Sequence, residues 1–395
     1  MLITKYFNTA FLPLLLLFTI GCSSGEEDFT PKLSVSNTIF TEGNPDGAAV
    51  LNLSIQKSAI SAVTFDYTIQ EGTAQQNLDY IGENGTVTFQ PGESTTTLSI
   101  DLVNDDDIEL NESFVVSFTL NNSPEVNANF EIVVENDDLS YDISSDSEGF
   151  ITPASYNSMK LIWSDEFDQS SLNLDNWSYN LGNGCDLGIC GWGNEELQNY
   201  TEDVDNVFLE NGRLFIRAKE DTPGNYTSGR ILSENKQAFK YGRVDIRAKL
   251  PEGQGIWPAL WMLGTNISDV GWPKCGEIDI MELKGQFPDV SYGTIHYDDN
   301  GYKYNSGSTS LTENKKFSDE FHVFSILWDR NKIIWYIDYI PFKTVSSAAI
   351  GTNYPFNNEF YFIMNIAVGG LFVGPPDEST VFSQQMEVDY IRVFQ

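Results

Sequence analysis

Apolar and polar residues alternate in short runs along most of the chain, and Gly, Pro, Asn and Asp residues interrupt these runs. A period of two predicts strands with one buried face, as at residues 49–55 and 86–89. Residues 346–350 are the best candidate for a helix. In the second half, strands rich in β-branched and aromatic residues are predicted at 213–219, 242–249 and 333–337. The pattern predicts an all-β protein.

Composition divides the chain into two blocks. Residues 31–138 hold 18 acidic and 2 basic residues and no tryptophan, whereas residues 160–395 hold 33 acidic and 19 basic residues and all 8 tryptophans. Residues 139–159 are polar and rich in Ser and Asp, which is typical of a linker. We expect a small β-sandwich over 31–138 and one large antiparallel β-sandwich over 160–395.

The N-terminus carries an export pattern. Residues 1–21 hold one lysine and an apolar stretch that is too short to span a membrane, as in a signal peptide. A Thr-Ile-Gly run before Cys22 resembles the cleavage box of a bacterial lipoprotein, with Cys22 as the lipidated residue. Residues 22–30 form an acidic tether that resembles the surface-export signals of some outer-membrane lipoproteins. We expect an exported lipoprotein of the outer membrane, with an ordinary secreted protein as the alternative.

Charge and rare residues narrow the choice of function. A net charge of −35 repels phosphate backbones and argues against a nucleic-acid partner. With only 2 histidines, metal or triad chemistry based on histidine has little material, whereas carboxylates are plentiful. In an exported protein Cys185 and Cys190 could close a small disulfide loop, which would leave Cys275 buried and free.

The most informative segment is residues 277–283, Glu-Ile-Asp-Ile-Met-Glu-Leu. In a regular strand Glu277 and Asp279 share a face and Glu282 points to the other, where an apolar core would make its burial costly. A β-bulge removes this conflict because one extra residue returns Glu282 to the face of the other two acids. A helix would scatter the three acids around its axis. The spacing favours a bulged strand lining a polar cleft over an exposed acidic strand.

Two carboxyl groups on one strand face suit the hydrolysis of a glycosidic bond with retention of configuration. That chemistry needs the two groups about 5–5.5 Å apart on either side of the scissile bond. We assign Glu277 as the nucleophile that attacks the anomeric carbon and Glu282 as the acid that protonates the leaving oxygen and later deprotonates water. Asp279 would bond to the nucleophile, and the proximity of like charges would push the pKa values apart.

The same segment resembles the signature of glycoside hydrolase family 16 in its bulged form, and the resemblance extends over residues 160–395. It implies a β-jelly-roll, a concanavalin A-like sandwich, and is most similar to the bacterial laminarinases, which are endo-acting β-1,3-glucanases. Supporting motifs start at Trp163 (WSDEF), Gly191 (GWGNE), Tyr226 (YTSGRI), Trp257 (WPALWM), Trp272 (WPKCGE) and Asn365 (NIAVGG).

The function implied is the cleavage of internal β-1,3-glucosidic bonds of laminarin-type glucans by double displacement, by a monomer that needs no cofactor for catalysis. Two alternatives stay open. One keeps the mechanism and changes the substrate to mixed-linkage β-1,3-1,4-glucan or an algal galactan. The other is a non-catalytic surface glucan-binding protein, but such proteins typically lose the catalytic glutamates, and Glu277 and Glu282 are both present.

Strand parity and the resemblance together indicate substrate-binding residues. Trp257 and Trp261 share one strand face, and sugar rings stack on aromatic side chains. His296 matches a laminarinase histidine on the leaving-group side, with a structural role as the alternative. For each tryptophan the alternative is a place in the core. Matching family positions add Trp192, Trp272, Asn194, Arg230 and Asn365, of which the last three lie near sugar hydroxyls on the nonreducing side.

Two calcium sites are expected from resemblance. Residues 31–138 resemble a Calx-β domain through Glu-Gly at 42, Gly-Thr-Ala at 72, Asp-Tyr at 79 and Asn-Asp-Asp at 136. That domain would hold Ca²⁺ among Glu42, Asp107, Glu109, Asp137 and Asp138, with a solvated acidic edge that binds no metal as the alternative. Family 16 members often hold a structural Ca²⁺ on the convex face, which here implies Glu166, Asp389 and the carbonyl of Gly212. An ion pair of Asp389 with a nearby arginine, such as Arg392, is the alternative there.

Overall fold

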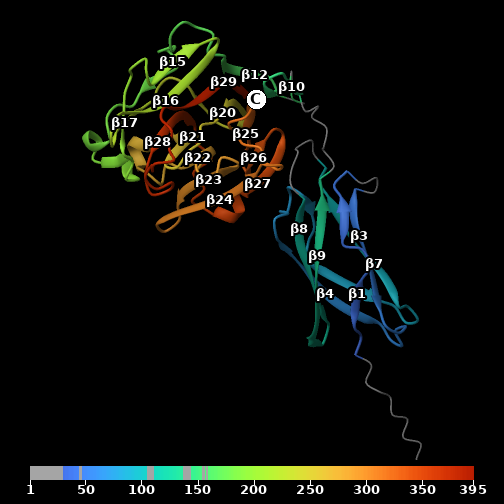
Figure 1. Cartoon of the computed structure of the whole chain (residues 1–395). Coiled ribbons are helices and arrows are strands. Elements are labelled where there is room, and N and C mark those ends of the chain that lie inside the picture. The colour runs from blue at the N-terminus through green and yellow to red at the C-terminus, as the bar shows by residue number, and fades with distance from the viewer. Residues whose placement is uncertain (1–29, 44–46, 105–110, 137–143, 154–155, 157–158) are drawn as a thin grey trace, which may run out of the picture.

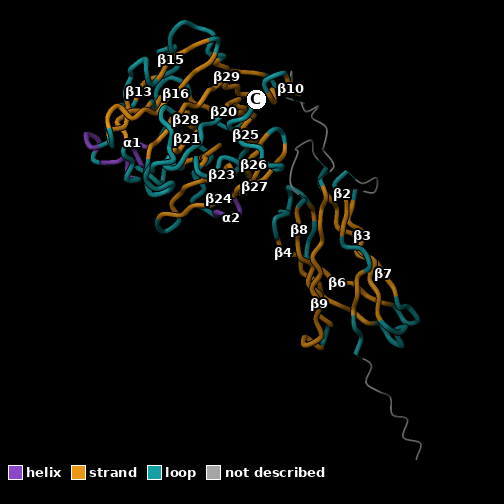
Figure 2. Tube along the Cα trace, in the orientation of Figure 1, coloured by secondary structure: helices purple, strands orange, loops and turns teal. Residues whose placement is uncertain are grey.

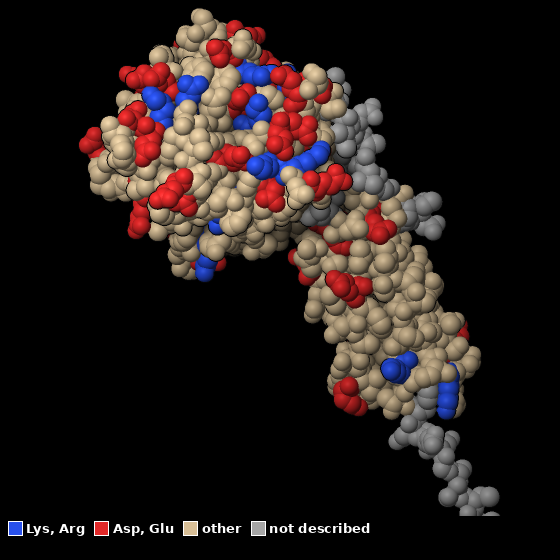
Figure 3. Space-filling model, in the orientation of Figure 1, with Lys and Arg blue, Asp and Glu red and all other residues tan. Residues whose placement is uncertain are grey.

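The computed structural model describes residues 30–43, 47–104, 111–136, 144–153, 156 and 159–395, and most of its regular elements are strands (Figures 1 and 2). This confirms the all-β prediction. On the face drawn in Figure 3, acidic side chains are spread over the molecule, and Lys and Arg lie among them. Within the described residues, no helix is long and apolar enough to cross a membrane.

The N-terminal domain is a β-sandwich of two sheets, with the orders β1-β3-β7-β5 and β2-β9-β8-β4-β6. In β7 the alternate residues Leu98, Ile100 and Leu102 enter the core, and the residues between them are exposed. The period of two therefore separates core from solvent. The strands are β1 (Leu33–Val35), β2 (Ile39–Thr41), β3 (Ala48–Ile55), β4 (Val63–Glu71), β5 (Tyr80–Ile81), β6 (Gly85–Phe89), β7 (Thr95–Leu102), β8 (Glu112–Leu120) and β9 (Ser123–Glu135).

The C-terminal domain is a larger sandwich. Its ten-stranded sheet has the order β14-β17-β16-β29-β20-β25-β26-β27, with β12 paired to β29 and β15 paired to β16. The strands of this sheet are β12 (Leu161–Asp165), β14 (Gln198–Tyr200), β15 (Val207–Glu210), β16 (Arg213–Thr222), β17 (Asn225–Ser228), β20 (Gly242–Lys249), β25 (His322–Trp328), β26 (Lys332–Ile337), β27 (Ile340–Ser346) and β29 (Gln384–Phe394).

Its second sheet is eight-stranded and has the order β13-β18-β28-β21-β22-β23-β24, with β19 paired to β28. Its strands are β13 (Ser178–Tyr179), β18 (Arg230–Leu232), β19 (Ala238–Phe239), β21 (Ile256–Gly264), β22 (Glu277–Leu283), β23 (Val290–Asp298), β24 (Tyr302–Ser310) and β28 (Phe360–Val368). The helices are short: η1 (Cys185–Leu187), η2 (Cys190–Gly193), α1 (Ile267–Val270) and α2 (Ser347–Ile350). The last of these confirms the helix predicted at 346–350.

The main core of the C-terminal domain lies between its two sheets. Val244 and Ile246 of β20 belong to the same buried cluster as Ile278 and Met281 of β22. Each fully buried aliphatic side chain contributes roughly 1.5–3 kcal/mol. Because these residues of β22 face the core, its acidic residues lie on the outer face of the eight-stranded sheet. We call this outer face the acid face.

The predicted linker, 139–159, is in part built into the C-terminal domain. Its strands β10 (Ser144–Asp146) and β11 (Gly149–Ile151) pair as a hairpin, which we call the strap (residues 144–153). Both the N–H and the carbonyl of Phe321 form backbone hydrogen bonds with the strap. In addition, Glu148 of the strap forms an ion pair with Arg213, and Asp146 forms one with Arg247. The acidic residues that make this segment look like a linker therefore pair with arginines of the ten-stranded sheet.

The strap and Tyr156 cover a buried cluster of charged residues. Arg243, Asp245 and Arg247 alternate with core residues along β20 and so lie on the outer face of the ten-stranded sheet, yet all three are buried. The Nε atom of Arg243 donates to Asp245 over 2.8 Å, and the hydroxyl of Tyr156 donates to the same carboxylate. Arg247 donates to Asp389 over 2.7 Å. The segment before β12 therefore keeps these charges paired and away from water.

Candidate active site

The strand β22 contains the predicted bulge. Against β21, Asp279 pairs with Trp261 and Met281 pairs with Leu260, so Ile280 is an extra residue without a partner of its own. The register against β23 shifts between Asp279 and Glu282. Ile280 and Met281 then both enter the core in succession. The bulge therefore brings Glu282 to the acid face, as the alternation of the sequence predicts.

A tryptophan from the other sheet supports the bulge from the core side. The indole N–H of Trp335 in β26 donates to the backbone carbonyl of Asp279 over 2.8 Å, and this tryptophan is fully buried. Gly293 of β23 makes room for the ring, because a Cβ atom at that position would lie 2.4 Å from Trp335. The distorted strand thus keeps a buried carbonyl satisfied.

Each of the two glutamates assigned to catalysis accepts a hydrogen bond from a tryptophan. Trp272 donates to Glu277 over 2.9 Å, and Trp257 donates to Glu282 over 3.0 Å. Thr294 lies 3.5 Å from Glu282. These N–H groups orient the two carboxyl groups.

His296 connects the remaining acids. Its Nε2 atom lies 3.1 Å from Asp279 and 3.6 Å from Glu277, while Nδ1 lies 2.8 Å from the hydroxyl of Tyr302. The donor atoms of Glu277, Asp279 and His296 lie within 4.8 Å of one another, as in a metal site. A protonated imidazole has no free lone pair for a metal, however. The pKa of His296 therefore decides whether its imidazole is a cation paired with the carboxylates or a neutral group that could bind a metal ion.

Burial and, to a lesser extent, the charge of Asp279 raise the pKa of Glu277 to about 7 and that of Glu282 to about 8. Burial lowers the pKa of His296, but its hydrogen bond to Asp279 and the nearby carboxylates outweigh this and raise the pKa to about 9. The imidazole is therefore cationic at neutral pH. The two raised glutamate pKa values mean that one of these carboxyl groups can keep a proton near neutral pH, as a general acid requires.

On the other side of β22, the acid face carries a polar network. Cross-strand pairing places Arg230 beside Asn365, Asn365 beside Ala259, and Ala259 beside Glu282. The amide oxygen of Asn365 accepts from the indole of Trp261 over 2.8 Å. The guanidinium of Arg230 lies 4.9 Å from the ring of Trp261, and its buried Nε has no hydrogen-bond partner.

A buried carboxylate completes this network and was missed by sequence reasoning. Glu196 accepts from Asn194 over 3.2 Å, from Gln198 over 2.7 Å and from the hydroxyl of Tyr200 over 3.2 Å. Tyr200 in turn accepts from Asn365 over 3.0 Å. A signal was present, because Glu196, Gln198 and Tyr200 follow each other at a spacing of two and so share a strand face.

The four predicted tryptophans differ in exposure. Trp272 is 49% exposed, and Trp257 and Trp261 are half-buried with their indole N–H groups directed into the site. Trp192 is only 7% exposed, and its ring lies 4.4 Å from the guanidinium of Arg230. Trp192 is therefore covered by Arg230, whereas Trp257, Trp261 and Trp272 are more exposed.

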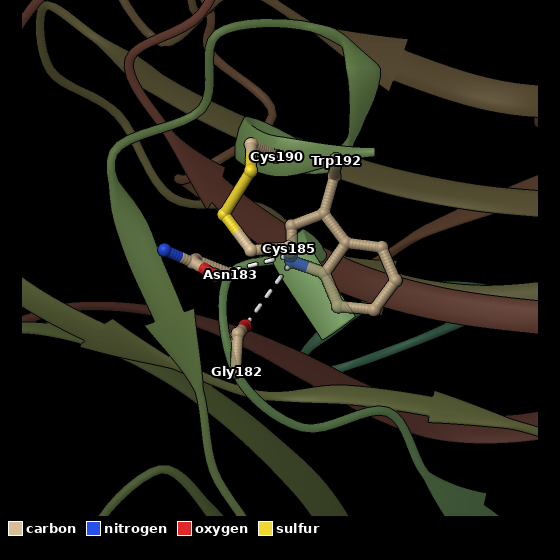
Figure 4. Close-up of a disulfide and its surroundings, with 5 residues drawn as sticks. All are labelled: Gly182, Asn183, Cys185, Cys190 and Trp192. Atoms are coloured by element: carbon tan, nitrogen blue, oxygen red, sulfur yellow. Dashed lines mark hydrogen bonds between the residues drawn. A yellow bond between two sulfur atoms is a disulfide. The ribbon is translucent and has the colours of Figure 1, made fainter. Parts of the chain in front are cut away.

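Trp192 follows directly after a small loop that a disulfide closes. The structure joins Cys185 to Cys190, and the indole of Trp192 donates to the carbonyl of Gly182 over 3.2 Å (Figure 4). The amide of Cys185 donates to Asn183 over 3.2 Å. The loop thus fixes the ring on which Arg230 lies. The third cysteine of the described residues, Cys275, is buried and free.

The residues of the two expected calcium sites have other partners or lie outside the described residues. Arg392 donates to both carboxylate oxygens of Glu166, over 2.9 and 2.8 Å, and Asp389 pairs with Arg247, while Gly212 lies in the turn between β15 and β16. Calcium there would have to displace these arginines. Glu42 is buried. Outside the described residues are Asp107, Glu109, Asp137 and Asp138, together with Cys22. Both calcium sites stay predictions.

A β-sandwich in which a bulged strand presents two glutamates and an aspartate beside tryptophans defines a glycoside hydrolase. The sequence profile of "Glycosyl hydrolases family 16" matches residues 194–392, about half of the chain, and that of "Calx-beta domain" matches residues 26–138. The chain belongs to glycosyl hydrolase family 16, with a Calx-β domain before the hydrolase domain.

Three similar proteins extend this comparison. "Glucan endo-1,3-beta-glucosidase A1" of Niallia circulans is 39% identical over 63% of this chain and 39% of its own length. "Beta-glucanase" of Rhodothermus marinus is 38% identical over 60% of this chain and 85% of its own length. The crystal structure of the laminarinase catalytic domain of Thermotoga maritima is 45% identical, with a TM-score of 0.56, over 60% of this chain and 98% of that one.

Proposed function

We propose that the protein is an endo-acting, retaining glycoside hydrolase that cleaves internal β-1,3-glucosidic bonds of laminarin-type glucans. The observation that carries the proposal is the bulge at Ile280, which puts Glu277, Asp279 and Glu282 on one face. Laminarin-type substrate is favoured by the similar proteins, of which one is an endo-1,3-β-glucosidase and one a laminarinase.

In the first step the ionised carboxylate of Glu277 attacks the anomeric carbon. The glycosidic bond breaks, and Glu282 gives its proton to the departing oxygen. In the second step Glu282 takes a proton from water, whose oxygen bonds to the anomeric carbon while Glu277 leaves as a carboxylate. Two inversions give net retention. Burial raises the pKa of Glu282, which lets this carboxyl group hold the proton that a general acid must give.

The test is product analysis with soluble laminarin, lichenan and agarose as parallel substrates. We expect short β-1,3-linked oligosaccharides from laminarin, with the β-anomer formed first in the NMR spectrum. Glu277→Gln should lower kcat by at least about 10³-fold, since the nucleophile is lost. Glu252→Gln removes a carboxylate that pairs with Lys316 at the surface and is the matched control. If only lichenan or only agarose is cleaved, the proposed substrate is wrong although the mechanism can stand. Full activity of Glu277→Gln would overturn the mechanism.

We also propose that the protein is an exported lipoprotein whose lipid on Cys22 holds it in the outer membrane. The apolar stretch in residues 1–21 and the Thr-Ile-Gly-Cys sequence support this proposal. Fractionation of cells that make the wild type or Cys22→Ser tests it. The wild type should sediment with outer membranes and Cys22→Ser should not. Equal solubility of both proteins would favour ordinary secretion.

A further inference from the structure

The edge strand β24 continues three cross-strand rows that start at the catalytic acids. Residues directly opposite each other in an antiparallel pair share one face of the sheet. The β22–β23 and β23–β24 registers therefore place three side chains of β24 on the acid face. The rows are Glu277–His296–Tyr304, Asp279–Thr294–Ser306 and Glu282–Tyr292–Ser308.

Two exposed tyrosines stand at the edge of this face. Tyr302 is 49% exposed and Tyr304 is 64% exposed, although tyrosines usually bury most of their ring. The ring of Tyr302 stacks with that of His296 at 5.7 Å and with that of Tyr304 at 6.1 Å. Trp272 lies 5.1 Å from Tyr302. The aromatic surface beside the nucleophile therefore reaches the last strand of the sheet, which Figure 1 shows beyond β23.

The polar groups of β24 hold this surface in place. The hydroxyls of Thr294 and Ser306 lie 2.9 Å apart, which links β24 to the row of Asp279. On the opposite face of β24, the buried Lys343 of β27 donates to Asn305, and its alkyl chain lies against Gly307. The edge strand is therefore fixed from both faces while Tyr304 stays open to solvent.

A glucan chain that passes between Glu277 and Glu282 must cross the strands, because these two acids lie along one strand. The β28 and β18 side carries Asn365 and Arg230, which the family resemblance places near the sugar hydroxyls on the nonreducing side. The β24 side is then left for the sugars beyond the scissile bond. We propose that Tyr304, with Ser306 and Ser308, forms a leaving-group-side subsite that binds a β-linked glucosyl unit by stacking and hydroxyl contacts. This inference rests on the proposed function.

The same subsite binds an acceptor sugar in the second step. The acceptor hydroxyl gives its proton to Glu282, its oxygen bonds to the anomeric carbon, and the ester bond to Glu277 breaks. A transfer product forms instead of a hydrolysis product. Loss of the Tyr304 ring should therefore weaken cleavage of polymer and transfer to added oligosaccharide together, because both depend on a sugar stacked at the same place.

The experiment uses the full chain and two substrates, laminarin and an aryl β-1,3-linked disaccharide whose phenol leaving group is not a sugar. For Tyr304→Ala we expect the ratio of kcat/KM on laminarin to kcat/KM on the aryl substrate to fall about tenfold, which is the size of one stacking contact. The ratio of transfer to hydrolysis with added laminari-oligosaccharide should fall in parallel. Tyr304→Phe, which keeps the ring, should restore most of both ratios.

Lys303→Ala is the matched control, because Lys303 is exposed on the same strand and lies on the opposite face. Both ratios should stay at the wild-type value in this variant. The inference is overturned if Tyr304→Ala leaves both ratios unchanged, or if Lys303→Ala lowers them equally. Wild-type protein that cleaves neither substrate would instead overturn the proposed function, and the two failures are therefore distinguishable.

Discussion

His296 supplies the positive charge that allows three acids to lie together. It lies within 3.6 Å of Asp279 and Glu277, and Tyr302 fixes its other ring nitrogen. Burial and mutual repulsion raise the pKa values of Glu277 and Glu282, and the imidazolium lowers both. The pKa of His296 itself, about 9, keeps it cationic over the range in which the glutamates titrate.

We predict that His296→Gln moves the acidic limb of the kcat/KM profile to higher pH by about one pH unit. The nucleophile must be ionised, and without the cation Glu277 keeps its proton to a higher pH, so activity below neutrality falls more than activity above it. Measuring kcat/KM from about pH 5 to 9 checks this. Tyr302→Phe keeps the imidazole and should give a smaller displacement. An acidic limb that stays in place would contradict this role of His296.

At the scale of elements, the bulged strand depends on a residue that is distant from it in the sequence. Trp335 comes from the opposite sheet, donates to the carbonyl of Asp279 and occupies the space above Gly293. A bulge leaves a backbone group without its ladder partner, and a buried unpaired carbonyl costs about 1–3 kcal/mol. The indole is therefore part of what holds Glu282 on the acid face.

Trp335→Phe should lower the free energy of unfolding by about 1–3 kcal/mol and should also lower kcat on laminarin, because the bulge relaxes. Denaturant unfolding and initial rates measure the two effects. Trp328→Phe is the matched control, since Trp328 is equally buried and donates to the carbonyl of Phe356, away from the acids. That variant should lose stability alone. If both variants lose activity to the same extent, the bulge does not depend on Trp335.

The sequence predicted those features that local alternation determines. Three acids at spacings of two and three between large apolar residues permit few arrangements, and the bulge at Ile280 is the arrangement found. The strands and the sandwich class follow from the same period of two. The family resemblance, which rests on motifs of several residues, then indicated the positions of Asn365 and Arg230, which are cross-strand neighbours.

Long-range pairing could not be predicted in the same way. Gln198 accepts from the backbone of Val368, and Tyr200 meets Asn365, so the network around Glu196 exists only after segments more than 160 residues apart have come together. The row from Glu277 to Tyr304 likewise depends on strand register. The composition of the strap predicts a linker because its contacts include ion pairs and backbone hydrogen bonds, which leave no apolar period in the sequence.

At the scale of the whole molecule, the boundary of the C-terminal domain lies before residue 160. The strap and Tyr156 cover Arg243, Asp245 and Arg247, and Thr152 donates to the hydroxyl of Tyr390 in β29. A buried ion pair that loses a partner is destabilised by about 3–5 kcal/mol. The segment between the two domains thus contributes to the stability of the second.

A version of the protein that begins at residue 160 should melt roughly 10 °C lower than one that begins at residue 144. The reason is that Asp245 and Arg247 lose Tyr156 and Asp146 as partners and meet water. Thermal unfolding followed by near-ultraviolet circular dichroism measures the difference. The version that begins at 144 should melt as this domain does in the full chain. Equal melting of the two shortened versions would show that the strap adds no stability.

Calcium can be assigned to a domain because the 8 tryptophans all lie in residues 160–395. Tryptophan fluorescence therefore follows the unfolding of the C-terminal domain alone, whereas calorimetry follows both domains. Calcium bound at Glu42 and the acidic loops should raise the melting temperature of the N-terminal domain in calorimetry. At a free calcium concentration of 100 times Kd, the free energy of unfolding should rise by about 2.7 kcal/mol. Glu42→Gln should reduce this gain. Calcium at Glu166 and Asp389 would raise the fluorescence transition instead. If neither calcium nor EDTA changes either melting temperature, both proposed calcium sites are contradicted.

The strap also determines where mechanical load enters the C-terminal domain. It lies on the outer face of the ten-stranded sheet, and the acids lie on the outer face of the other sheet, so the thickness of the sandwich, about 10 Å between sheets, separates them. A polysaccharide lying over Glu277 and Glu282 would therefore be on the opposite side of the sandwich from the strap. If the N-terminus is tethered, pulling on it would load the contacts of the strap with Arg213, Arg247 and the backbone of Phe321. The strands that carry the acids would not bear this force directly.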